Sequence, residues 1–201
     1  MKTEIDKKID ELDYQLQDIK RRLAELRRQR PREEVRDYRL LDCEGREASL
    51  SSLFGDHNEL ILVHNMGRQC SYCSMWADGF VGLLPHITSR AAFVVTSPDE
   101  PAVQRAFARS RGWNFPMYSV AGSSMVSDMG FDDPGEGLMP GVSTFTKEPD
   151  GKIYRVGRAE FGPGDDFCPV WHFLELFPKG IDGWEPKPDQ ELLQLSCSTA
   201  N

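Results

Sequence analysis

The first 30 residues carry the most regular hydrophobic pattern of the chain. Apolar side chains recur there at alternating spacings of four and three residues, at Ile5, Ile9, Leu12, Leu16, Ile19, Leu23 and Leu26. This spacing is the heptad seam of a coiled coil, held for about three heptads. The first Pro or Gly is Pro31, so residues 1–30 are predicted to form one coiled-coil-like helical arm. A seam this narrow suits a partner helix better than a broad domain surface, which predicts a homo-oligomer formed through residues 5–26.

Short apolar runs separated by turns follow the arm. Buried strands are predicted at residues 59–65 and 91–96. An amphipathic helix is predicted after each strand, over residues 71–87 and then up to Gly112. A further apolar segment at residues 114–119 completes two strand–helix–strand units, which favour parallel strands joined by right-handed crossovers.

Weaker patterns complete the predicted domain. We expect a strand at 38–42, short helical segments at 49–54 and 125–129, a loop at 132–141, a hairpin of 142–146 and 152–156, and a closing helix at 169–176. The turn of the hairpin is Glu148-Pro-Asp-Gly. Residues 31–183 are therefore predicted to form one α/β domain with a central mixed sheet flanked by helices. Residues 184–201, rich in polar side chains and proline, are expected to be a flexible tail.

Charge separates the arm from the rest of the chain. The 201 residues carry a net charge of −8, whereas the arm, with nine Lys and Arg against seven Asp and Glu, is at +2. The remaining 171 residues are therefore at −10. Because phosphate binding needs a basic surface, this acidic body argues against nucleic acid as the main partner. The chain has no apolar leader and no run of about 18 apolar residues, so we expect a cytoplasmic protein without a membrane partner.

Cys70 and Cys73 are the one close pair among five cysteines. In a reducing cytoplasm such a pair is catalytic or metal-binding more often than structural. The pair lies where the predicted strand 59–65 turns into the predicted helix 71–87. Unpaired N–H groups and the helix dipole stabilise a thiolate at Cys70, which is predicted to attack, while Cys73, one turn deeper, is predicted to resolve.

Zinc binding is the main alternative for this pair. Cys168 and His172 would complete a Cys3His set with Cys70 and Cys73. Their aromatic neighbours favour packing instead, and no motif brings the two halves together, so we predict no metal site. The lack of a P-loop and of G-x-G-x-x-G predicts no nucleotide cofactor. A third hypothesis is a non-catalytic, self-associating module that only keeps the fold.

Two further ionisable side chains lie near the pair in sequence. His64 ends the predicted central strand, six residues before Cys70, and Asp78 follows Cys73 by five residues. Either group would assist a thiol that it faced. A hydrogen-bonded, half-buried histidine and a solvated helix carboxylate are the more common cases, and we favour them here.

Several motifs resemble the thioredoxin and peroxiredoxin superfamily. The resemblance to peroxiredoxins and membrane-tethered thioredoxins is carried by residues 49–55, 60–63, 70–73 and 143–152. The chain is more similar still to a thioredoxin-like family of unknown function with a Cys-x-x-Cys-Ser-x-Trp-Ala-Asp-Gly-Phe signature, here at residues 70–80. The family also has an N-terminal helical arm and segments similar to residues 111–116 and 127–131 of this chain. With these features the resemblance covers most of residues 1–178.

This resemblance implies a thioredoxin-like fold with Cys70 and Cys73 at the active-site position, and it implies no particular substrate. Gln69 stands where thioredoxins have Trp before the first Cys, and Val142 takes the place of their cis-proline. The peroxiredoxin motif Thr-x-x-Cys would need Thr in place of Gly67. We therefore expect thiol–disulfide exchange with a disulfide-bearing protein or a small thiol, rather than peroxidase activity.

Overall fold

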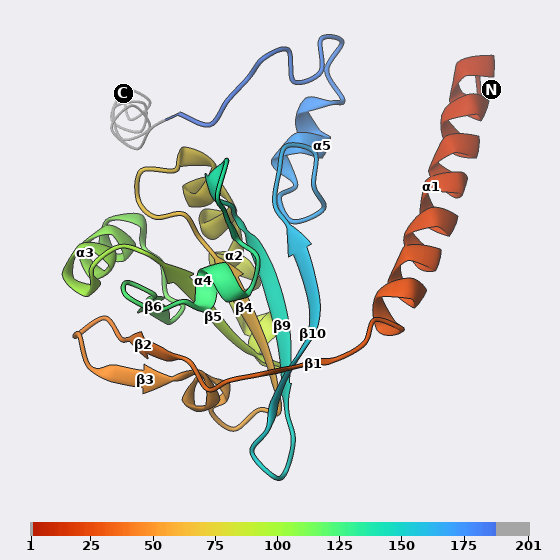
Figure 1. Cartoon of the computed structure of the whole chain (residues 1–201). Helices are drawn as coiled ribbons and strands as arrows, with labels where there is room; N and C mark the ends of the chain where they lie inside the picture. The colour runs from red at the N-terminus through yellow and green to blue at the C-terminus, as the bar shows by residue number, and fades with distance from the viewer. Residues whose placement is uncertain (1, 188–201) are drawn as a thin grey trace.

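The heptad seam lies on one helix, α1 (Glu4–Arg28), in a computed structural model that describes residues 2–187. Thr3 caps this helix, because its hydroxyl accepts the N–H of Asp6 while the Asp6 carboxylate accepts the N–H of Thr3. Acidic residues in the first turn and basic residues in the last turn complement the helix dipole. None of the residues of α1 is buried, and Figure 1 shows the helix standing apart from the rest of the fold.

A mixed sheet of eight strands forms the centre of the fold (Figure 1). In spatial order the strands are β1 (Glu33–Val35), β10 (Ile153–Glu160), β9 (Gly141–Lys147), β4 (Glu59–His64), β5 (Ala92–Ser97), β6 (Met117–Ser119), β2 (Arg39–Leu41) and β3 (Glu47–Ser49). Strands β4, β5 and β6 are parallel, and the other neighbours in the sheet pair antiparallel. The structure confirms the predicted α/β class with a central mixed sheet flanked by helices.

Two helices connect the parallel strands, as the strand–helix–strand pattern predicts. Helix α2 (Ser71–Thr88) joins β4 to β5, and α3 (Pro101–Arg111) joins β5 to β6. Their apolar side chains pack on one face of the sheet, together with those of α5 (Val170–Leu174). The opposite face is covered by the 3₁₀ helix η1 (Leu50–Phe54) and by α4 (Met125–Asp128).

Side chains alternate between these two layers along β4. Leu60 and Leu62 pack in the layer of η1 and α4, whereas Ile61 and Val63 pack in the layer of α2. The alternation sends His64 to the same face as Leu62, where its ring stacks on Phe131 with centroids 4.1 Å apart. The strand therefore separates the His64 side chain from the layer that contains α2.

The structure differs from the prediction mainly at the edges. The sequence pattern does not indicate β1 or β3, because three-residue strands with polar side chains carry too few positions to show alternation. The expected loop 132–141 contains a small hairpin of β7 (Asp132–Asp133) and β8 (Gly137–Leu138). Strands β9 and β10 are longer than predicted, with a bulge between Arg155 and Gly157, and α5 is shorter.

The first residues of the expected tail pack on the domain. Trp184 meets Trp171 edge-on, with ring centroids 5.7 Å apart, and Pro186 is buried. The remaining part of the predicted tail, residues 188–201, lies outside the described residues, as does Cys197. None of the helices within residues 2–187 has both the length and the apolar character needed to span a bilayer.

Candidate active site

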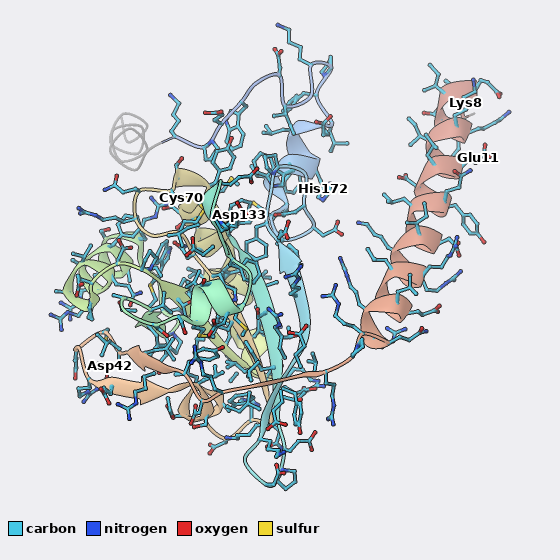
Figure 2. The ribbon with its side chains drawn as sticks, viewed as in Figure 1. Lys8, Glu11, Asp42, Cys70, Asp133 and His172 are labelled. Atoms are coloured by element: carbon cyan, nitrogen blue, oxygen red, sulfur yellow. The ribbon has the colours of Figure 1, made fainter. Side chains whose placement is uncertain are left out.

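Cys70 is the N-cap residue of α2, six residues after the end of β4 (Figure 2). Its Sγ accepts the N–H of Cys73 at 3.0 Å, which is the contact that a Ser or Asp oxygen makes in an ordinary cap. The Cys73 thiol and the N–H groups of Cys73 and Tyr72 lower the pKa of Cys70 to about 7, although burial opposes them. Cys70 is only half-buried, so this acidic thiol is accessible to a substrate.

Cys73 lies one turn deeper and is 2% exposed. Its Sγ accepts the N–H of Met66 at 3.4 Å. The hydrogen bond to the Cys70 sulfur, and then burial, hold the pKa of Cys73 far above its usual range. The two thiols titrate as a coupled pair in which Cys70 loses its proton first.

Two side chains that the sequence analysis did not single out hold the loop between β4 and α2. The Asn65 amide accepts the N–H of Gly67 at 2.8 Å and donates to the Cys73 carbonyl at 3.4 Å. The Asp99 carboxylate accepts the N–H of Arg68 at 2.9 Å. Asn65 and Asp99 follow the carboxyl ends of two adjacent parallel strands, where α/β folds place their sites. Polar residues at these two positions are the signal that would have located them.

The His64 ring is buried and makes its contacts on the face opposite α2. Its Nε2 lies 2.9 Å from the Ser143 hydroxyl, while its Nδ1 has no partner among the described residues. Burial, followed by the positive charge of Arg155, lowers the pKa of His64 to about 3. The imidazole is therefore neutral at neutral pH and packs as a hydrogen-bonded core residue.

Asp78 is bound by side chains at the end of α3. Its carboxylate accepts the Arg111 Nε–H at 3.0 Å and the Trp113 indole N–H at 2.8 Å, and a second guanidinium nitrogen of Arg111 also donates to it. The bidentate ion pair ties α2 to the end of α3. Asp78 is thus a solvent-exposed carboxylate, as we expected, and it also forms an ion pair that joins two helices.

Val142 lies near the start of β9, in register with Val63 and in the layer of α2. Gly141 precedes it at a point of close approach, since a Cβ there would lie 2.2 Å from the Phe131 ring and 2.5 Å from the Ala159 carbonyl oxygen. Every peptide bond of the described chain is trans. Val142, which we expected at the place of the thioredoxin cis-proline, is an apolar packing residue.

The residues of the alternative zinc site have separate surroundings. Cys168 is buried with Trp76 and Trp171, and burial raises the pKa of its thiol. His172 is exposed on α5, 3.8 Å from Asp166 (Figure 2). Over residues 2–187, no three His, Cys, Asp or Glu side chains are grouped closely enough to hold a metal ion.

Aromatic side chains cover the first turn of α2 beside Cys70. The Tyr72 ring stacks on Trp171 with centroids 6.1 Å apart and lies at the same distance from Trp76. Burial, followed by the negative charges of Glu185 and Cys70, raises the pKa of Tyr72. The buried Trp171 of the C-terminal segment therefore packs against the first turn of α2, next to the reactive thiol.

Comparison with known proteins assigns the chain to a family. The profile of a family described as bacterial protein of unknown function, DUF899, matches residues 10–190. The chain therefore belongs to the DUF899 family. No curated protein matches it.

Solved structures of peroxiredoxins resemble the fold. Peroxidoxin BcpB from Mycobacterium tuberculosis is 25% identical, with 64% of this chain and 84% of that chain covered and a TM-score of 0.52. Reduced Prx3 from Vibrio vulnificus, determined in complex with H2O2, is 14% identical, with 66% and 88% covered and a TM-score of 0.52. The second likeness shows the fold alone. The likeness to BcpB places the chain in the thioredoxin and peroxiredoxin superfamily and supports a thioredoxin-fold redox function in general.

Proposed function

We propose that this protein is a thiol–disulfide oxidoreductase that uses the Cys70–Cys73 dithiol. The observation that carries the proposal is the opposite behaviour of the two sulfurs. The accessible Cys70 sulfur caps α2 and has its pKa lowered to about 7, whereas Cys73 is buried behind it with a raised pKa. Cys70 is therefore suited to attack a substrate disulfide, and Cys73, one helical turn away, is suited to resolve the mixed disulfide.

The exchange proceeds in two displacement steps. The Cys70 thiolate attacks one sulfur of a disulfide R–S–S–R′, forms Cys70–S–S–R and releases R′S⁻, which takes a proton from water. Cys73 then gives its proton to water and attacks the Cys70 sulfur, which forms the Cys70–Cys73 disulfide, breaks the bond between Cys70 and the substrate sulfur, and releases RS⁻. The protein loses two electrons and the substrate gains them, so no further cofactor is needed. The reverse sequence oxidises two substrate thiols.

The substrate in this proposal is a disulfide of a protein or of a small thiol compound, and the compartment is the cytoplasm. The partly exposed ring of Tyr72, two residues after Cys70, suits contact with a polypeptide segment around a disulfide. The cytoplasm suits a pair that must return to the dithiol state, because its thiol pool is reducing.

Trapping the mixed disulfide tests the proposal. With oxidised glutathione, Cys73→Ser is expected to accumulate one glutathione on Cys70, because the second displacement is lost. Cys70→Ser is expected to gain none at Cys73, which is buried. The control is Cys43→Ser, which removes an exposed cysteine outside the pair and is expected to cycle as the wild type does. Peptide mapping by mass spectrometry locates each glutathione, and a Cys73→Ser protein that is unmodified at Cys70 contradicts the assignment.

Peroxide reduction at Cys70 is the second candidate, because the BcpB structure that resembles this fold is that of a peroxidoxin. Attack of the Cys70 thiolate on ROOH would give Cys70–SOH and ROH after protonation, and condensation with Cys73 would release water and form the disulfide. Gly67 offers no hydroxyl group at the place of the threonine in Thr-x-x-Cys. We therefore expect disulfide exchange to be faster than peroxide consumption, and stopped-flow measurements with both oxidants decide between them.

A further inference from the structure

The apolar seam of α1 is exposed along its whole length. Its seven members are between 42% and 69% exposed: Ile5, Ile9, Leu12, Leu16, Ile19, Leu23 and Leu26. The helix touches its own domain through an ion pair of Lys20 with Asp166 at 2.6 Å, yet buries none of its residues there. Figure 2 shows α1 apart from the sheet, with Lys8 and Glu11 on it. A continuous aliphatic line in water is a surface for association.

The carboxyl-terminal end of α1 borders a basic cavity of about 490 Å³. Its walls combine Val and Thr side chains of β9 and β10 with five arginines, which are Arg27, Arg28, Arg30, Arg32 and Arg158. Arg32 pairs with Glu148. In a chain whose residues 31–201 carry a net charge of −10, this cluster is suited to an acidic segment.

The first half of α1 is such a segment, and it combines the apolar seam with Glu4, Asp6, Asp10, Glu11 and Asp13. It does not reach the cavity of its own chain, because a rise of 1.5 Å per residue places Asp6 about 32 Å from Arg27 along the helix. A second copy running in the opposite direction brings its acidic half to this basic end. Two-fold symmetry repeats the contact at the other end.

We propose that two copies of this protein associate through antiparallel packing of their α1 helices. In heptad notation Ile9, Leu16 and Leu23 occupy a, and Ile5, Leu12, Ile19 and Leu26 occupy d. In one register every a residue faces a d residue of the second copy. This register pairs Ile9 with Leu26, Leu12 with Leu23, and Leu16 with Ile19 of the second copy. Each of these residue pairs occurs twice in the dimer, so the apolar seam from Ile9 to Leu26 is covered by the second helix.

The flanking charges select this register. Asp6, Asp13, Lys20 and Arg27 occupy e positions. In this register Asp6 lies beside Arg27 of the second copy and Asp13 beside its Lys20, so four opposite-charge pairs form per dimer. A parallel dimer would instead place Lys8 beside Asp13 twice and Arg22 beside Arg27 twice, so its two attractions would be offset by two repulsions. In the dimer Lys20 gives up its exposed ion pair with Asp166 and forms one with Asp13 of the second copy. This exchange costs little free energy, because exposed ion pairs contribute little to stability.

Light scattering at micromolar concentration tests the association. The wild type is expected to have twice the chain mass of 22.8 kDa, and Leu16→Lys with Leu23→Lys is expected to have the chain mass. The matched control is Tyr14→Lys, on the face opposite the seam and 75% exposed, which is expected to remain dimeric. An unchanged rate of Cys70 alkylation shows that the domain of each variant is folded. A wild-type mass of one chain overturns the proposal.

Charge reversal tests the orientation. Asp13→Lys is expected to weaken the dimer about tenfold, since it replaces two attractions by two repulsions. Adding Lys20→Asp is expected to restore most of the affinity, because the pair is re-formed with its charges exchanged. Glu11→Lys makes the same change of charge outside the seam and is the control. Sedimentation equilibrium measures the dissociation constants, and failure of the second substitution to restore affinity overturns the antiparallel arrangement.

Discussion

The Asp99 carboxylate accepts the backbone N–H of Arg68 at 2.9 Å, which ties the residues after β5 to the loop that leads to Cys70. The same carboxylate accepts the Ser97 hydroxyl at 3.2 Å. We expect Asp99→Ala to lower the free energy of unfolding by about 1–2 kcal/mol, because both donors lose their acceptor. We also expect iodoacetamide to alkylate Cys70 faster, because the loop beside it is no longer held.

A matched control for Asp99→Ala is Asp133→Ala. The Asp133 carboxylate accepts the N–H groups of Gly135 and Glu136 in the β7–β8 hairpin, outside the loop of Cys70. This variant is expected to lose stability without a change in Cys70 alkylation. Equal alkylation rates in the wild type and Asp99→Ala would show that the Asp99 contact does not order the loop.

The pH dependence of alkylation reports the ionisation of Cys70. With a pKa of about 7, the thiolate fraction and the rate are expected to rise through neutral pH and to level off above it. Cys73→Ala removes the largest cause of the lowered pKa, so the inflection is expected to move to higher pH. Peptide mapping by mass spectrometry assigns the rate to Cys70. An inflection that does not move in Cys73→Ala contradicts the hydrogen-bonding explanation.

The ion pair of Asp78 with Arg111 is expected to stabilise the fold and to leave the thiols unaffected. Asp78→Asn weakens the contacts with Arg111 and Trp113. It is expected to cost about 1 kcal/mol, since the carboxylate is partly exposed and solvent screens the pair. Urea unfolding measures the loss. If the alkylation profile of Cys70 shifts in this variant, Asp78 acts on the thiol as well.

The neutral His64 makes stability depend on pH in the acid range. Its pKa is about 3 in the folded chain against 6.5 for the ordinary side chain. Between these values the unfolded chain binds more protons, so stability is complete above about pH 6.5 and falls as pH decreases, by up to about 1.4 kcal/mol per pH unit. His64→Gln is expected to flatten this dependence, whereas the exposed control His86→Gln is expected to keep it. Urea titrations at several pH values compare the two.

The close approach at Gly141 predicts a large cost for a single methyl group. Gly141→Ala places a carbon within 2.2 Å of the Phe131 ring and 2.5 Å of the Ala159 carbonyl oxygen. We expect a loss of about 3 kcal/mol, because neighbouring backbone must move. Gly82→Ala, inside α2 with no atom near the new carbon, is expected to be neutral or to stabilise by up to about 1 kcal/mol. Thermal unfolding of both variants measures the contrast.

Local periodicity predicts those parts of the fold that do not need a distant partner. The run from Leu60 to Val63 and the amphipathic pattern after Cys70 locate β4 and α2 within a residue or two. Strand β1 depends instead on contacts 122 residues away in sequence, such as the ion pair of Glu33 with Arg155. No periodic pattern in three residues records such a pairing.

The same distinction applies to the candidate site. The position of Cys70 and Cys73 at the start of a helix follows from their spacing and from the strand before them. The hydrogen bonds of Asn65 and Asp99 depend on the shape of the loop 66–69, which hydrophobic patterns do not describe. The side of the sheet on which His64 lies could be predicted from alternation along β4. Adjacent residues of a strand point to opposite faces, so His64 points away from the face of Val63.

The alternation of side chains along β4 has a consequence for how the sequence can change during evolution. Leu62 and Val63 are adjacent in the chain but lie in two separate interiors, one around Phe131 and the other around Trp76. Substitutions that share no contacts have additive effects on stability. Substitutions in the interior around Phe131 therefore change stability without changing the cost of substitutions in the interior that supports the thiols, so the two halves of the core can drift at different rates during evolution.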